Sequence, residues 1–356
     1  MTEFHHLVIV IMDRQCVYLR LDLLKKNLVR DCYSNKINSI NQLSLTKKHF
    51  SSCLEDSLSS TIRVKRGKRL EVSTCLHIAC LFSRVEIVER LLDLGADPQQ
   101  VDGVHESPLH KACVTKINCK EKIQLLLSKD PTLVLKKTRH GTYPVHMVSR
   151  RSDPRCLKTL LEIDPRHAGY VTKKKLTPLH VAANTGLVQN IEMLLLNPYV
   201  NVNAADIHGH TPAHHAAIGS HMDALLLIAR QAHYDMHCQN YAKLIASECL
   251  SIEKALFFHA TISSHDTFTQ YLSTLDDVHD IVAFRYRDQT VLHSIASSDV
   301  DSSRKAEFVV ERHPALLHTR NDSRQLPLHV AAMNQGRNLL EFIILVSCQN
   351  GGRRYC

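Results

Sequence analysis

One short segment recurs along this chain at a nearly constant interval, and this recurrence limits the possible fold more than any other feature. The full motif combines a Thr or Ser, a Pro, an apolar residue, a His and two small residues, and the copies keep the His while some replace one of the other residues. The clearest copies are residues 74–80, 107–113, 177–183, 211–217 and 326–332, and two weaker ones are 143–149 and 290–296. Their histidines stand at positions 77, 110, 146, 180, 214, 293 and 329, so the intervals are 33, 36, 34, 34, 79 and 36 residues. A chain with such a period is expected to fold as a stack of similar units.

Each copy carries the signals that begin an α-helix. The Thr or Ser is a good N-cap, and the Pro that follows suits the first helical position. Two and three residues after the histidine come small side chains, such as Ala182 and Ala183, which allow neighbouring helices to approach closely. Apolar residues then recur at offsets of 11, 14 and 15 from the histidine, as in Val88, Leu91 and Leu92, which is the spacing of one helical face. Each repeat is therefore predicted to hold two helices, and the chain is predicted to be an all-α repeat solenoid.

This pattern resembles the ankyrin repeat family, whose period is about 33 residues and whose signature is T-P-L-H-x-A. The resemblance covers about residues 71 to 348 and implies seven to eight helix-turn-helix repeats joined by β-hairpin finger loops. It also implies that the recurrent histidine makes a structural hydrogen bond between finger and helix. We number the repeats of His77, His110, His146, His180 and His214 one to five.

The interval of 79 residues after His214 is the main irregularity in the array. We expect an enlarged, degenerate repeat over 241–289, in which 241–246 takes the place of the motif and Leu244 the place of the histidine. The alternative is a break that separates two rigid blocks. Residues 1–70 are expected to form an N-terminal extension, with an amphipathic capping helix at 15–29 followed by a polar, basic linker. Residues 349–356 are expected to form a tail.

Composition excludes several classes of protein. The longest early apolar run, 7–12, is far shorter than the roughly 20 residues that cross a bilayer, so neither membrane insertion nor a signal peptide is expected. The 12 cysteines are scattered without a C-x-x-C pair, which favours a reduced, intracellular protein. We expect a cytoplasmic location, with the nucleus as an alternative because the basic run 63–69 could act as an import signal.

No motif for catalysis or cofactor binding is present in the sequence, so we expect neither an enzyme nor a cofactor. Cys80 and Cys113 occupy equivalent repeat positions and are interpreted as small buried side chains. The group His208, His210, His214 and His215 could in principle hold zinc. However, His214 is accounted for by the repeat and no cysteine pair completes a site, so no metal site is expected.

Binding of another macromolecule remains as the expected function. Resemblance to the ankyrin family implies that partners meet the finger tips and the exposed face of the first helix of each repeat. Mapped onto this sequence, those positions are Arg139, His140, Arg150, Arg151, Lys173, Lys174, Asn184, Thr185, Ile207, His208 and His210. Five of these eleven carry a fixed positive charge, all in repeats three and four, which favours an acidic protein segment as the partner.

Two other functions stay open. The chain could be the cytoplasmic ankyrin portion of a larger channel or multidomain protein. It could also be a nucleic-acid-associated regulator, since its formal net charge is +9. Nucleic-acid binding is not favoured, because aromatic residues are few and acidic residues interrupt the basic ones. The oligomeric state does not follow from the sequence.

Overall fold

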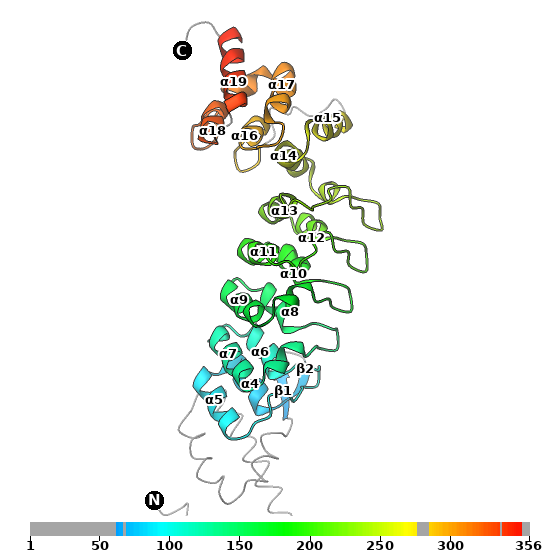
Figure 1. Ribbon diagram of the computed structural model, residues 1–356, viewed down its shortest axis with the longest axis vertical. Coiled ribbons are helices and arrows are strands. Elements are labelled where there is room, and N and C mark those ends of the chain that lie inside the picture. The colour runs from blue at the N-terminus through cyan, green and yellow to red at the C-terminus, as the bar shows by residue number, and fades with distance from the viewer. Residues whose placement is uncertain (1–61, 67–68, 276–284, 335–336, 351–356) are drawn as a thin grey trace, which may run out of the picture. The chain divides into compact units, whose positions relative to one another are not determined.

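A computed structural model describes residues 62–66, 69–275, 285–334 and 337–350 of the 356-residue chain. The predicted capping helix at 15–29 and most of the predicted linker lie outside the described residues. The described part is built almost entirely from pairs of short helices (Figure 1). This confirms the predicted all-α repeat solenoid.

The helices alternate between a first and a second helix of each repeat. In chain order the pairs are α4 (Cys75–Phe82) with α5 (Val85–Asp93), α6 (Pro108–Val114) with α7 (Cys119–Lys129), α8 (Pro144–Ser149) with α9 (Pro154–Ile163), α10 (Pro178–Thr185) with α11 (Val188–Leu195), α12 (Pro212–Ile218) with α13 (Met222–Ala229), α14 (Ile252–Ile262) with α15 (His265–Thr274), α16 (Val291–Ala296) with α17 (Ser302–Arg312), and α18 (Pro327–Met333) with α19 (Arg337–Asn350).

The chain divides into two compact units. The first comprises the described residues up to Val181 together with Leu196–Val200, and the second comprises Ala182–Leu195 together with the described residues from Asn201 onward. In the first unit α6 packs between α4 and α8, and α7 packs between α5 and α9. In the second unit α16 packs between α14 and α18, and α17 between α15 and α19. Within each unit, first helices therefore stack on first helices and second helices stack on second helices.

The small residues after each histidine lie where the first helices stack. Ala79, Cys80, Ala112 and Cys113 have no exposed surface, as predicted for a column of small side chains. The apolar stripe of each second helix completes the core, and Leu91 is equally buried. Burial of the two thiols raises their pKa, that of Cys80 to about 12, so they are protonated core groups.

The fingers are short turns closed by backbone hydrogen bonds. In repeat three the Thr138 amide donates to the Thr142 carbonyl at 3.0 Å, and in repeat four the Thr172 amide donates to the Leu176 carbonyl at 3.0 Å. The residue five places before the histidine has positive φ in each of these turns, being Gly141 at +73° and Lys175 at +57°. Figure 1 shows these loops on one side of the helices of the first unit.

Where Asp-Pro or His-Pro comes directly after the last residue of the second helix, the chain begins a 3-10 helix that leads into the next finger. The side chain of Asp130 accepts a hydrogen bond from the Thr132 amide, and that of Asp164 accepts one from the Arg166 amide. The Pro then occupies the first helical position, which suits its fixed φ. These helices are η1 (Pro131–Leu135), η2 (Pro165–Gly169) and η4 (Pro314–His318).

The long interval after His214 differs from our expectation in which residue takes the histidine position. His214 bonds the Leu244 carbonyl at 2.8 Å, and in repeat one His77 bonds the Glu106 carbonyl in the same way. Glu106 stands four places before the next histidine, so the histidine position after Leu244 is Glu248, and the assignment of that position to Leu244 is wrong. The Glu248 carboxylate accepts from the Ile245 amide at 2.8 Å and begins the short 3-10 helix η3 (Ala246–Cys249).

A complete helix pair, α14 with α15, follows η3 before the motif returns at His293. Lys305 donates to the Ala260 carbonyl at 3.2 Å, as Lys122 donates to the Cys80 carbonyl at 3.0 Å in the first unit. This correspondence aligns Ala260 with Cys80, and it places Phe257, which is buried, at the histidine position. The interval between His214 and His293 therefore holds two first helices, of which one is truncated to η3 and the other, α14, is complete.

The end of the predicted basic linker is a strand pair. Strands β1 (Ile62–Arg66) and β2 (Arg69–Ser73) are antiparallel, with Ile62 opposite Ser73. In the sequence, Ile62 and Val64 alternate with basic residues, and this period of two favours a strand over a linker. Among the described residues, no helix is both long and apolar enough to cross a membrane.

Candidate interaction surface

The eleven predicted partner-binding residues are divided between the two units. Six belong to the first unit, and these are Arg139, His140, Arg150, Arg151, Lys173 and Lys174. The other five belong to the second unit, and these are Asn184, Thr185, Ile207, His208 and His210.

In the first unit the fingers of repeats three and four are joined to each other. The Lys173 amide donates to the His140 carbonyl at 3.1 Å, which ties one finger tip to the next. Arg139 and His140 are exposed on the first tip, and Lys173 and Lys174 are exposed on the second. The backbone therefore holds these side chains in adjacent positions on the surface.

Further basic side chains extend this surface, and the sequence analysis missed them. Lys137 precedes the first finger tip and Lys175 follows the second, and both are exposed. Neither 136–143 nor 170–177 contains an acidic residue. The basic finger surface, which we define as Lys137, Arg139, Lys173, Lys174 and Lys175, thus carries five fixed positive charges. The runs of consecutive basic residues in these two segments were the signal that could have revealed it.

The two arginines after α8 differ in their surroundings. Arg150 is exposed at the C-terminal end of the helix. Arg151 is only partly exposed, and its Nη1 donates to the Cys113 carbonyl at 3.3 Å. Cys113 lies near the C-terminal end of α6, where carbonyl groups lack partners within the helix. Arg151 therefore caps the preceding repeat, which leaves its guanidinium less accessible to a partner.

In the second unit, the predicted contact residues are mixed in character. Asn184, Ile207 and His208 are exposed, whereas Thr185 is half-buried and its hydroxyl donates to the Ala182 carbonyl at 3.0 Å. The Tyr241 amide donates to the His208 carbonyl at 3.1 Å, so these two finger tips are also joined. This set carries no fixed charge.

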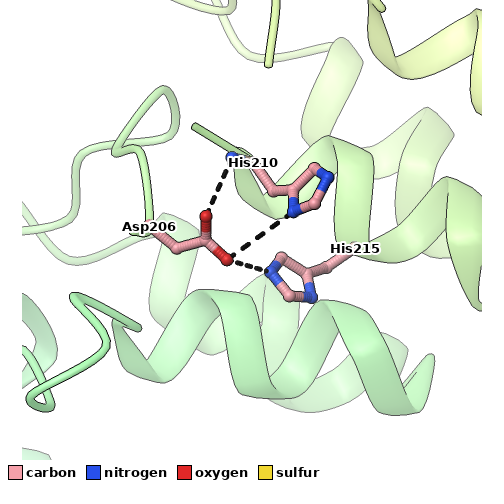
Figure 2. Close-up of side chains that lie close together, drawn as sticks. All are labelled: Asp206, His210 and His215. Atoms are coloured by element: carbon pink, nitrogen blue, oxygen red, sulfur yellow. Dashed lines mark hydrogen bonds and ion pairs between the residues drawn. The ribbon is translucent and has the colours of Figure 1, made fainter. Parts of the chain in front are cut away.

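His210 lies in a group that includes a residue absent from our predictions. The buried carboxylate of Asp206 has Oδ2 3.0 Å from His215 Nε2 and 3.8 Å from His210 Nδ1 (Figure 2). Asp206 and His210 belong to the finger of repeat five, and His215 belongs to α12. In the part of the chain that the structure describes, this is the one group of three His, Cys, Asp or Glu side chains with donor atoms close enough to share a metal ion. His208 and His214, which we had considered with them, are not in it.

The family model for ankyrin repeats, described as three copies, matches residues 32–137 and 145–240. These segments span more than half of the chain, so the protein belongs to the ankyrin repeat family, which is a general protein-interaction fold.

Among individual proteins, the chain is similar to a mouse protein named B-cell lymphoma 3 protein homolog, with 28% identity over 186 residues, 49% of this chain and 40% of the relative. It is also similar to the chicken Nuclear factor NF-kappa-B p105 subunit, with 29% identity over 175 residues, 49% of this chain and 18% of the relative. The human Transient receptor potential cation channel subfamily A member 1 is 27% identical over 197 residues, 44% of this chain and 17% of the relative. The chain thus spans less than half the length of these relatives.

Proposed function

We propose that this ankyrin-repeat protein is a non-catalytic scaffold that binds an acidic segment of a partner protein on the basic finger surface of its first unit. The relatives include a subunit of a nuclear factor and a cation channel, so family membership alone does not select a partner. The positive charge of the two joined finger tips is the feature that favours an acidic partner.

The observation that supports this proposal is the uninterrupted positive charge of the joined tips. Surface charge of one sign attracts a segment of the opposite sign and accelerates its association. The hydrogen bond between Lys173 and His140 holds the two tips together before binding, so little backbone ordering is needed on this side of the complex. Lysine and arginine side chains then contact carboxylates in any of several registers.

Binding of a synthetic peptide rich in Asp and Glu to the full chain tests this function. Its affinity is measured by fluorescence anisotropy at low and at physiological salt. The triple variant Arg139→Glu, Lys173→Glu, Lys174→Glu should weaken binding by at least about tenfold, because each reversal replaces an attraction with a repulsion. Raising the salt should weaken binding to the unmodified protein, because exposed charges are screened.

A charge-matched control separates this surface from the net charge of the protein. Lys116, Lys129 and Lys158 are exposed basic residues of the same unit that lie outside the two fingers. The triple variant that changes these three lysines to glutamate has the same net charge as the finger variant. It should bind the peptide within about threefold of the unmodified protein. Equal losses in both variants would show that only net charge matters, and the proposal would fail.

A further inference from the structure

The finger of repeat five presents a carboxylate to α12 in a defined orientation. Asp206 Oδ1 accepts hydrogen bonds from the His208 amide at 2.7 Å and the His210 amide at 2.9 Å, and these bonds fix the carboxylate plane. Its other oxygen, Oδ2, faces the imidazoles of His210 and His215 (Figure 2). Asp206 is 4% exposed, whereas the two imidazoles are 26% and 20% exposed. The group is therefore anchored on its inner side and open on its outer side.

Repeat two shows what the same three positions do when they carry other residues. Asp102, Glu106 and Lys111 stand eight places before, four places before and one place after His110, as Asp206, His210 and His215 stand relative to His214. The Lys111 ammonium lies 2.7 Å from Asp102 and 2.7 Å from Glu106, and it is buried. The finger and the first helix thus converge on a point that a cation occupies in repeat two.

Repeat five has no fixed cation at this point. It has one carboxylate and two imidazoles, which are the oxygen and nitrogen ligands that Zn²⁺ accepts. Ligand atoms about 2.1 Å from a tetrahedral ion lie roughly 3.4 Å from one another. The distances of 3.0 and 3.8 Å from Asp206 Oδ2 to the two imidazole nitrogens bracket that value.

From this geometry we propose that Asp206, His210 and His215 form a Zn²⁺ site that fastens the finger of repeat five to α12. The ion takes the position that the Lys111 ammonium has in repeat two. Because His210 and His215 are partly exposed, the fourth ligand comes from the outer side, either as water or as a group of a bound partner. The backbone hydrogen bonds to Asp206 Oδ1 act as the second shell that orients the ligand.

Two variants that preserve the fold can be designed from the chain itself. Asn240 plays the part of Asp206 in the following finger, where its Oδ1 accepts from the Ala242 and Leu244 amides, so Asp206→Asn should keep the turn. The double variant His210→Glu, His215→Lys recreates the ion triad of repeat two and should fold while placing an ammonium where the metal would lie. His233→Gln, at an exposed position of the same unit, serves as the control.

Zinc titration of the full-length, reduced protein against a chromophoric chelator tests the site. We expect the unmodified protein and His233→Gln to bind one Zn²⁺ that the double variant does not bind. Asp206→Asn should weaken this binding by at least about tenfold, because it removes the charged ligand. Circular dichroism should show the helical content of the unmodified protein in each variant, as a check that the variants fold.

Substitution with Co²⁺ identifies the ligands. Cobalt in the proposed site should give the visible bands of a four-coordinate ion without a thiolate charge-transfer band, and these bands should be lost in the double variant. Equal zinc binding by the unmodified protein and the double variant would overturn the proposal. So would the absence of zinc binding to the unmodified protein, or a thiolate band showing that cysteines hold the metal.

Discussion

The recurrent histidine connects three parts of the structure at the scale of a single residue. In repeat two His110 Nδ1 lies 2.8 Å from the Ser107 hydroxyl, and Nε2 lies 3.2 Å from the Thr142 carbonyl of the next finger. A carbonyl only accepts, so Nε2 carries the proton and Nδ1 accepts from the hydroxyl. His146 bonds the Leu176 carbonyl in the same way at 3.0 Å. This confirms the structural role that the family resemblance implied, with the finger belonging to the following repeat.

Acidification should destabilise the protein through these histidines. Burial lowers the pKa of His110 and of His146 to about 4, from an ordinary value of 6.5. Between these values the unfolded chain binds more protons than the folded one, so the stability present above pH 6.5 is lost as the pH falls toward 4. One pKa unit corresponds to about 1.4 kcal/mol. Urea unfolding at pH 7.5, 6.5 and 5.5 should therefore give a steadily lower free energy of unfolding.

The same pH series in two variants tests whether the buried histidines cause the loss of stability at low pH. His110→Gln should reduce the slope of stability against pH, because it removes one titrating group. His140→Gln should leave the slope unchanged, since His140 is exposed on a finger tip. A slope that is the same in all three proteins would contradict this explanation.

The buried lysine Lys305 should also contribute stability that increases with pH, here in mildly alkaline solution. Its side chain has no exposed surface, and burial lowers its pKa from 10.5 to about 8. Between pH 8 and 10 this lysine thus binds fewer protons in the folded protein than in the unfolded chain, so its contribution to stability rises with pH. In thermal unfolding between pH 8 and 9.5, the slope of stability against pH should be lower in Lys305→Met than in the unmodified protein, while Lys158→Met, at an exposed lysine, should keep the slope of the unmodified protein. An unchanged slope in Lys305→Met would show that another group is responsible.

At the scale of the element, side chains of several repeats bond the carbonyl groups at the helix end of the repeat before them. The Thr115 hydroxyl donates to the Leu81 carbonyl at 2.8 Å, and the Ser298 hydroxyl donates to the Thr261 carbonyl at 2.6 Å. Arg151 serves α6 in the same way. Since the last carbonyls of a helix have no partner within it, these contacts help to specify how successive repeats stack.

Close approach of two fingers should make Gly141 difficult to replace. It has φ +73°, and a Cβ at this position would lie 2.8 Å from the Lys173 amide nitrogen. Gly95 has φ +97°, but a Cβ there would meet nothing within 4 Å. Both alanine variants incur the cost of positive φ, about 1–2 kcal/mol. Gly141→Ala should cost about 1 kcal/mol more than Gly95→Ala in urea unfolding, and equal costs would contradict the close approach.

At the scale of the whole molecule, stability should be close to a sum over repeats and their interfaces. Leu126 is fully buried on α7, which packs against α5 and α9. In the second unit α17 has the same place between α15 and α19. A cavity beside one such helix should therefore weaken its own repeat and the two neighbouring repeats first.

Hydrogen exchange can follow this local effect. Leu126→Ala should cost about 2–4 kcal/mol and should accelerate amide exchange in α5, α7 and α9 more than in α16 and α18. Leu196→Ala, at a side chain that is 87% exposed, should change exchange little anywhere. Uniform acceleration in both units after Leu126→Ala would mean that the array unfolds as one cooperative body.

Local chemistry allowed the repeated architecture to be predicted from the sequence. Thr or Ser followed by Pro begins a helix, and the offsets of Val88, Leu91 and Leu92 mark a buried face, because both signals act within a few residues. The basic residues Arg139, Lys173 and Lys174 were assigned to finger tips through the resemblance to the ankyrin family, and the structure places them there. The same locality explains why the histidine position was misplaced at Leu244, since Glu248 keeps the role without the motif.

Contacts between residues far apart in the chain were established only by the folded structure. Arg151 matched the pattern of an exposed helix end, yet it reaches a carbonyl 38 residues away. Asp206 had no special signal in the sequence, because its relation to His215 exists only when the finger folds back against α12. Short-range rules describe how each repeat forms, but which polar groups meet depends on the distance between packed elements, and that distance arises from the stacking of the repeats.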